Sequence, residues 1–282
     1  MTWASTSLIW LASFPKSGNT WARLLLANLL VDSEEAININ DFKLNGGLGA
    51  CRDRFEYLTQ ADASLLLPKE IEQLRPKVND AYAASLTETA FCKIHDAYTN
   101  LADGTPVIGK AARAALYLVR DPRDVAVSYA YHCDCPLDHA VNLLDPAENV
   151  SKGGIDSRFL PQRLGNWSHH VSSWIDQRDL PVYLIRYEDL LADTEGTFKK
   201  ALEFLDIQSS DADIARAVRH TSFSELSRQE KANGFKERVG SAPFFREGKV
   251  GSWRGKLSLD QVRAIESMHG EIMEKLGYQP ER

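Results

Sequence analysis

The sequence predicts an α/β fold: a single domain, residues 1–282, with a central parallel sheet flanked by helices. Short apolar runs bounded by turn-forming residues are typical of buried strands, and they lie at 8–12, 91–95, 115–119 and 182–186. Segments with helical periodicity lie at 20–30, 196–206 and 258–276. Strands that alternate with helices favour a parallel sheet covered on both faces, whose ligands bind beyond the carboxyl ends of the strands.

Local signals support two of these helices. The segment 196–206 places apolar residues at relative positions 0, 3, 4 and 7, namely Phe198, Ala201, Leu202 and Leu205. The segment 258–276 begins with a capping-box pattern, Ser258 and Gln261, and stops at Gly277. Both therefore read as helices that pack one face against the sheet.

Length and composition narrow the class of protein. With 282 residues and 44% hydrophobic content, the chain can bury one sizeable core. The net charge of −6 gives no global attraction for nucleic acid or an anionic membrane, so we expect neither partner. Four cysteines are too few for a disulfide scaffold, and the N-terminus lacks a signal-peptide pattern. These features predict a cytoplasmic protein.

The loop after the first predicted strand is a candidate anion site. Because it opens a helix, its backbone N–H groups point to one place and carry partial positive charge. Gly18 allows close approach, Lys16 adds a charge, and three short side chains can donate hydrogen bonds: Ser17, Asn19 and Thr20. The alternative is an ordinary turn with a surface lysine. The unit is P-loop-like, yet it is not a Walker A motif, and no later carboxylate stands out as a magnesium ligand.

The run 15–21, Pro-Lys-Ser-Gly-Asn-Thr-Trp, resembles the 5′-phosphosulfate loop of the cytosolic sulfotransferase family. The resemblance implies that this loop, Trp21 included, binds 3′-phosphoadenosine-5′-phosphosulfate (PAPS) and that 3′-phosphoadenosine-5′-phosphate (PAP) is the product. It also implies a second motif for the 3′-phosphate. Arg120 and Ser128 have the spacing of that motif, with Arg120 at a strand end and Ser128 on the next helix, so both can reach one phosphate.

Three further segments resemble the family in the same order, and the likeness runs from about residue 8 to residue 256. It implies that Tyr187 lies near the adenine, together with Thr221, Ser222 and Phe223. It also implies that the turn of Arg246, Glu247 and Gly248 contacts the 3′-phosphate. Glu247 departs from the lysine of animal members, so either this carboxylate points away from the phosphate or the turn binds less tightly. The family's dimer motif is also altered, which leaves the oligomeric state open.

Lys93 and His95 are the candidate catalytic pair. With the period of two of a strand, both side chains fall on one face. The Lys-x-His pattern resembles the family segment whose histidine is the general base, and a histidine suits that role at neutral pH. We expect Lys16, Ser128 and the loop N–H groups to stabilise the leaving phosphate, and Lys93 to assist at the transferring oxygens, without a metal.

A cluster of possible metal ligands was weighed against this interpretation. His132, Cys133, Cys135 and His139 lie close in sequence, but the Cys-x-Cys spacing lacks the usual two-residue spacer and no second pair follows. We therefore predict no metal site. The helix-like segment 165–174 resembles a family segment near the active site, and structural roles are expected for its two histidines.

The sequence thus predicts a sulfotransferase that moves the sulfuryl group of PAPS to an alcohol or phenol. The acceptor is expected to be a small molecule, chosen by lid segments at 38–54 and 133–161. The Asp-Ala-Tyr that follows His95 looks closer to bacterial members than to animal ones. Two alternatives stay open: a small-molecule kinase with a P-loop, and a module that binds PAP without catalysis.

Overall fold

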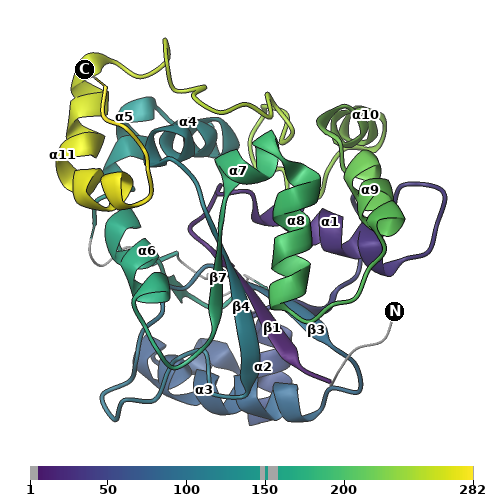
Figure 1. The fold of residues 1–282 in the computed structure, drawn as a ribbon. Coiled ribbons are helices and arrows are strands. Elements are labelled where there is room, and N and C mark those ends of the chain that lie inside the picture. Colours follow the sequence, from purple (N-terminus) through teal and green to yellow (C-terminus); the bar gives the residue numbers. More distant parts are fainter. Residues whose placement is uncertain (1–5, 147–149, 152–157, 282) are drawn as a thin grey trace.

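A parallel sheet of five strands forms the centre of the structure, in the order β2-β3-β1-β4-β7 (Figure 1). The computed structural model describes residues 6–146, 150–151 and 158–281. The strands are β1 Leu8–Ser13, β2 Asn45–Leu48, β3 Ala90–Ile94, β4 Ala112–Val119 and β7 Val182–Arg186. All neighbouring pairs run parallel, so the carboxyl ends of β3, β1, β4 and β7 meet at one edge. This confirms the predicted fold class and all four predicted strands.

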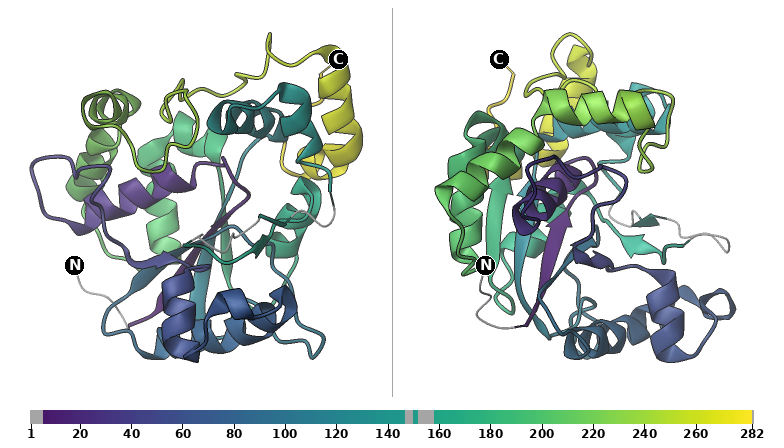
Figure 2. Two further views of the ribbon diagram at one scale, coloured as in Figure 1. Left: turned by 180° about the vertical axis from the view of Figure 1, so that it is seen from behind. Right: turned by 90° about the vertical axis from the view of Figure 1, so that its right-hand side faces the viewer.

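The helices form a layer on each face of the sheet, as Figures 1 and 2 show. They are α1 Asn19–Leu30, α2 Arg52–Thr59, α3 Pro68–Ala84, α4 Pro122–Cys133, α5 Leu137–Asn142, α6 Trp167–Ile175, α7 Tyr187–Ala192, α8 Thr194–Phe204, α9 Asp211–His220, α10 Phe223–Asn233 and α11 Leu259–Lys275. A short turn of helix, Ala63–Leu65, precedes α3, and a small antiparallel pair joins β5 Val150–Ser151 to β6 Gln162–Arg163. Within the described ranges, none of the helices has the length and apolar character of a membrane span.

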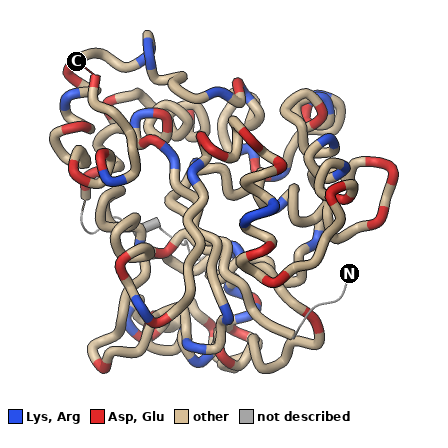
Figure 3. Tube along the Cα trace, viewed as in Figure 1, with Lys and Arg blue, Asp and Glu red and all other residues tan. Residues whose placement is uncertain are grey.

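Successive side chains of each strand point to opposite faces of the sheet, so the hydrophobic core has two parts, one on each face. Ile9 and Leu11 of β1 face α1, α8 and α9, whereas Leu8, Trp10 and Ala12 face α4, α6 and α11. The predicted helices match α1, α8 and α11, and the capping box of Ser258 is present. Lysines and arginines are interspersed with acidic residues along the trace (Figure 3), so neither sign of charge gathers on one side of the molecule.

The two predicted lid segments meet each other. Leu160 N donates to Ala50 O at 2.8 Å, and Arg52 N donates to Arg158 O at 3.0 Å. The segment 38–54 contains β2, which the sequence analysis missed because its Asn-Gly-Gly-Leu run has no strand pattern. Of the segment 133–161, residues 147–149 and 152–157 lie outside the described part of the chain.

A buried ion pair fixes the chain next to β3. The Arg75 guanidinium of α3 donates two hydrogen bonds to the Asp96 carboxylate, at 2.8 and 2.7 Å, and both side chains are almost fully buried. The same carboxylate accepts from Arg163 N at 2.9 Å. Asp96 directly follows His95, so this pair holds the strand end that carries the candidate base.

Replacing Asp96 with alanine should therefore destabilise the protein strongly, because it leaves a guanidinium buried without its counter-ion. We expect a loss of roughly 3–5 kcal/mol in the free energy of unfolding. Urea unfolding measures it, and Lys199→Ala is the matched control, since Lys199 pairs with Asp211 in an exposed ion pair. Equal unfolding midpoints for the two variants would contradict the expectation.

Candidate active site

A cavity of about 780 Å³ opens at the carboxyl edge of the sheet. Residues from the loop after β1, the end of β3, the end of β4, α4 and the segment 236–249 line it. The sequence-predicted residues that line it are Lys16, Gly18, Asn19, Thr20, Trp21, Lys93, His95, Arg120, Ser128, Tyr187, Thr221, Phe223, Arg246, Glu247 and Gly248. Ser17 and Ser222 do not line it: Ser17 is fully buried, and Ser222 caps α10 on the outside.

The loop after β1 turns sharply into α1. Gly18 is the N-cap residue with φ +97°, and a Cβ atom there would lie 2.8 Å from the ring of Tyr187. Only glycine fits that position without strain. Lys16 also has a left-handed backbone, with φ +69°. The Ser17 hydroxyl is buried with no hydrogen-bond partner in the described part of the chain.

His95 is held in one tautomer by the end of β1. Its Nδ1 lies 2.7 Å from the Ser13 carbonyl oxygen, and a carbonyl can only accept a hydrogen bond, so Nδ1 carries the proton. The lone pair is therefore on Nε2, which has no partner among the described residues. Burial, followed by the charge of Lys93, holds the pKa of His95 well below its ordinary value, so the ring is neutral. A neutral imidazole with a free Nε2 can accept a proton.

Two lysines share the cavity and repel each other. Burial and then the charge of Lys93 lower the pKa of Lys16 to about 7. Burial and then the charge of Arg23 lower the pKa of Lys93 to about 8. The Lys16 ammonium lies 4.2 Å from the centre of the Phe244 ring. A bound anion would favour the charged form of both amines.

The sequence analysis missed an ion pair at the centre of this cavity. Arg23, on the second turn of α1, donates to both oxygens of Glu237 at 2.8 and 2.7 Å, and the Thr20 hydroxyl donates to the same carboxylate at 3.0 Å. Burial alone would raise the pKa of Glu237, but Arg23 and Lys93 outweigh it and lower that pKa to about 2. No local motif marks either residue, because 214 positions separate them.

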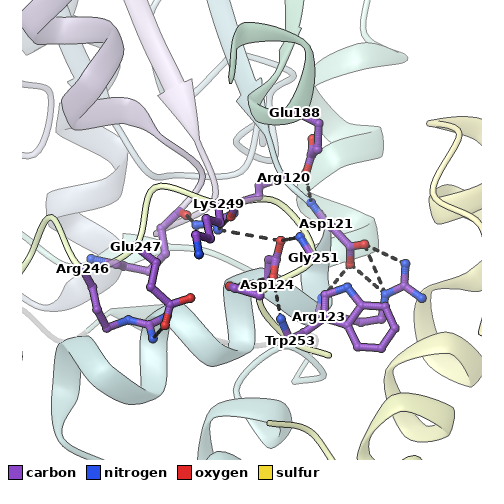
Figure 4. Close-up of polar contacts among 12 residues, drawn as sticks. Arg120, Asp121, Arg123, Asp124, Glu188, Arg246, Glu247, Lys249, Gly251 and Trp253 are labelled. Carbon is purple, nitrogen blue, oxygen red and sulfur yellow. Dashed lines mark hydrogen bonds and ion pairs between the residues drawn. The ribbon is translucent and has the colours of Figure 1, made fainter. Parts of the chain in front are cut away.

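Arg120 is aimed at the cavity by backbone and ring contacts. Its guanidinium donates to Lys249 O at 3.1 Å and lies 3.8 Å from the Asp124 carboxylate (Figure 4). It also lies 4.3 Å from the centre of the Tyr187 ring. Its Nε is buried with no hydrogen-bond partner in the described ranges. A guanidinium with an unused donor at a cavity is suited to bind an anion.

The Asp124 carboxylate holds the segment 251–253 beside Arg120 by hydrogen bonds. Its fully buried carboxylate accepts from Gly251 N at 2.8 Å, from Trp253 N at 2.9 Å and from the Ser252 hydroxyl at 3.0 Å (Figure 4). The Arg-Asp-Pro-Arg-Asp motif thus supplies both a cavity-facing cation and the carboxylate that anchors the turn. The anchoring role of Asp124 was not predicted.

Glu247 is neutralised by two neighbouring cations. Its carboxylate pairs with Arg246 and Lys256, and the hydrogen bond from Lys256 is the main cause of its lowered pKa. Arg246 also stacks on Tyr131, 3.9 Å from the ring centre. Arg246 is therefore partly engaged, as Figure 4 shows, and any anion at this turn must compete with Glu247 for it.

An aromatic group lines the far end of the cavity. Trp21 packs edge-on against Tyr187 and donates from Nε1 to Thr221 O at 3.1 Å. The Thr221 hydroxyl is used inside α9, where it donates to Ala217 O at 2.8 Å. Phe223 is 40% exposed and packs so closely on Gly248 that a Cβ there would meet its ring at 2.4 Å. These rings offer flat apolar surfaces to a planar ligand.

Part of the cavity wall is apolar, and it includes Phe42, Leu44, Leu48, Phe91 and Leu164. Leu48 is the β2 partner of Lys93, two residues before His95. Among the residues that the structure describes, no three His, Cys, Asp or Glu side chains come together in a way that could hold a metal ion. His132 and Cys133 instead line the cavity, where burial and the two lysines lower the pKa of His132 to about 4.

Comparison with known proteins agrees with this arrangement. The family described as the sulfotransferase domain matches residues 7–277. Sulfotransferase 1B1 of Mus musculus is 29% identical over 166 residues, 56% of this chain and 53% of that protein. Luciferin sulfotransferase of Photinus pyralis is 26% identical over 267 residues, 89% of this chain and 67% of that protein. The crystal structure of mouse sulfotransferase SULT7A1 complexed with PAP has a TM-score of 0.59 and 22% identity, covering 96% of this chain and 86% of that chain.

The chain spans 53% of the length of the mouse 1B1 protein and 67% of that of the Photinus protein. The solved structure, at 22% identity, shows a shared fold. All three proteins come from animals, so the likeness to bacterial members stays a prediction.

The lowered lysine pKa values predict how the binding of an anionic ligand depends on pH, and PAP, the ligand of the mouse structure, is the probe. An anion binds the charged amines better, so PAP affinity should be highest below the Lys16 pKa of about 7 and fall as the pH rises through it and through the Lys93 pKa of about 8. The loss of charge on each lysine can lower the PAP affinity by up to about tenfold per pH unit. Titration calorimetry between about pH 6.5 and pH 9 measures it. Lys16→Ala should flatten the profile and Lys199→Ala should not; a flat profile for the native protein would contradict the expectation.

Proposed function

The chain belongs to the sulfotransferase domain family, and we propose that it transfers the sulfuryl group of PAPS to the hydroxyl of a small alcohol or phenol and releases PAP. One observation carries the proposal: His95, with its free Nε2, shares a cavity with Lys16, Lys93 and Arg120. The cations suit a polyanionic donor, and the neutral imidazole suits a hydroxyl acceptor.

The chemistry follows from the tautomer of His95. As the acceptor oxygen forms its bond to sulfur, Nε2 takes the hydroxyl proton and the bond from sulfur to the bridging oxygen of the donor breaks. The imidazolium that results keeps its Nδ1–H on the Ser13 carbonyl, 2.7 Å away. The negative charge of a bound donor offsets the repulsion from Lys93 and raises the pKa of His95 towards its ordinary value, which makes it a better base.

The donor is assigned to the polar half of the cavity. Lys16, Ser128 and the N–H groups of the loop 16–20 would hold the 5′-phosphosulfate, since a helix N-terminus and an ammonium both stabilise a leaving phosphate. Arg120 and Ser128, with the turn 246–248, would hold the 3′-phosphate. Trp21 and Phe223 would enclose the adenine. The Arg120 guanidinium lines the cavity and fits such a polar occupant.

The acceptor would lie beside His95, against the apolar lining and the described cavity residues of the two predicted lid segments, such as Leu48 and Phe159. Leu44, Leu48 and Phe91 line this side and suit a ring or an aliphatic body next to the reacting hydroxyl. The kinase alternative is not favoured, because the loop lacks the Gly-Lys-Ser/Thr of a P-loop kinase. All four cysteines are free thiols, which supports a reducing compartment such as the cytoplasm.

Replacing His95 with alanine tests the base. Turnover should fall by about 10²–10⁴-fold, whereas PAP affinity should stay within a few-fold, since the ring touches the acceptor rather than the nucleotide. Initial rates and calorimetry give the two quantities. His169→Ala is the matched control, because this exposed histidine lies on α6 away from the reacting atoms. Near-native turnover in His95→Ala would overturn the assignment.

The 3′-phosphate tests the donor site. The native protein should prefer PAP to AMP by several kcal/mol, since each charge-assisted contact that AMP lacks contributes roughly 1.5–3 kcal/mol. Arg120→Ala should lower the affinity for PAP strongly and the affinity for AMP hardly at all. Arg246→Ala should have a smaller effect, because Glu247 already engages that guanidinium.

Titration calorimetry decides between these outcomes, with Arg228→Ala as control, since Arg228 is exposed on α10 and pairs with Glu225. Equal losses for PAP and AMP in Arg120→Ala would mean that Arg120 supports the fold. A native protein with no preference for PAP would remove the donor assignment.

A further inference from the structure

An unbroken hydrogen-bonded path connects His95 to Glu237. It runs from the ring of His95 to Ser13, then to Asn19, then to Arg23 and finally to the Glu237 carboxylate. Ser13 is fully buried, and Asn19 and Arg23 are 5% and 9% exposed, so water does not compete for these contacts. The path joins the candidate base to the segment between α10 and the Phe244-Phe245 turn.

Asn19 pins the end of β1. Its Nδ2 donates to Leu11 O at 2.9 Å and to the Ser13 hydroxyl oxygen at 3.2 Å. These contacts hold both the backbone and the side chain around the carbonyl that accepts from His95. The same Ser13 presents two groups to Nδ1, its carbonyl at 2.7 Å and its hydroxyl at 3.2 Å. The carbonyl requires a proton on Nδ1, whereas the hydroxyl could donate to an unprotonated Nδ1 and so permit the opposite tautomer.

Arg23 determines which way Asn19 points. Its Nε donates to Asn19 Oδ1 at 3.1 Å, so the amide must turn its Nδ2 towards Leu11 and Ser13. Its NH2 group donates to the Thr20 hydroxyl at 2.9 Å and to Glu237, which leaves the guanidinium no other position. A lysine at this place keeps the charge but lacks the planar fork that reaches Asn19 and Glu237 together.

We infer that Arg23, held by Glu237, is a positioning residue that keeps His95 in the tautomer with a free Nε2. The inference rests on the proposed function, in which His95 is the base. In this view His95 depends on Arg23, a residue of α1 that contacts neither the donor sulfur nor the acceptor hydroxyl.

The tautomer of His95 is the direct test, and it requires no turnover. The full-length chain, labelled with ¹⁵N at histidine, is measured by long-range ¹H–¹⁵N correlation, with His95→Ala used to assign the ring. The native protein should show a protonated Nδ1 and an unprotonated Nε2. Arg23→Ala and Arg23→Lys should both show a mixture of the two neutral tautomers.

Kinetics provides the second readout. In both Arg23 variants kcat should fall by about 10–100-fold, as when the partner that orients a functional histidine is lost, while the Kd of PAP stays within a few-fold. Arg216→Ala is the matched control. Arg216, on α9, has a side-chain exposure of 12%, against 10% for Arg23, and pairs with Asp213 of the same helix and with Asp32, which follows α1. The control should keep the native tautomer and kcat.

The outcomes separate the possible roles of Arg23. Rescue of kcat by Arg23→Lys would mean that charge alone matters and would overturn the inference. So would a native tautomer in both variants, or an Nε2-protonated ring in the native protein. Lysine keeps the charge and most of the bulk, so Arg23→Lys remains informative if Arg23→Ala does not fold. A native protein with the expected tautomer but no transfer to any acceptor would contradict the proposed function and leave the positioning intact.

Discussion

Lys16, Lys93 and Arg120 reach one cavity from three different strand ends, and burial makes their shared positive charge costly unless an anion lies among them. Two carboxylates meet part of this need: Glu237 pairs with Arg23, and the buried Asp124 lies 3.8 Å from the Arg120 guanidinium. Burial first, and the neighbouring cations second, keep the pKa values of both lysines lowered. A ligand with several negative charges would offset these costs, and the proposed phosphosulfate donor is such a ligand.

The parallel sheet turns this charge cluster into a reaction site. β1 ends at the carbonyl that orients His95, β3 ends at His95 itself, and β4 ends at Arg120. The buried pair of Arg75 with Asp96 and the turn held by Asp124 keep two of these ends rigid. Rigid strand ends matter because transfer between a hydroxyl and a sulfuryl group depends on alignment more than on covalent help from the protein.

Much of the site could be predicted from sequence because its signals are local. The loop 15–21 and the pair Lys93 and His95 each lie within one strand end or one turn, where spacing fixes direction. Arg23 and Glu237 escaped prediction because their contact spans 214 residues and neither stands in a motif. β2 escaped because Gly46 and Gly47 give no strand pattern, and α3 because Pro76 lies inside a helix. Glu247 pairs with both Arg246 and Lys256, and the spacing of residues along the chain does not predict that Lys256 lies next to this carboxylate.

The central claim is that the cavity moves a sulfuryl group onto a hydroxyl. Its most direct test is the transfer of ³⁵S from labelled PAPS to a panel of phenols and alcohols, with the native protein and His95→Ala run in parallel in the presence of a chelator. The account predicts a labelled sulfate ester for at least one acceptor with the native protein and a loss of about 10²–10⁴-fold with the variant. Equal label transfer by the two proteins, or label that appears only as inorganic sulfate across the whole panel, would contradict it.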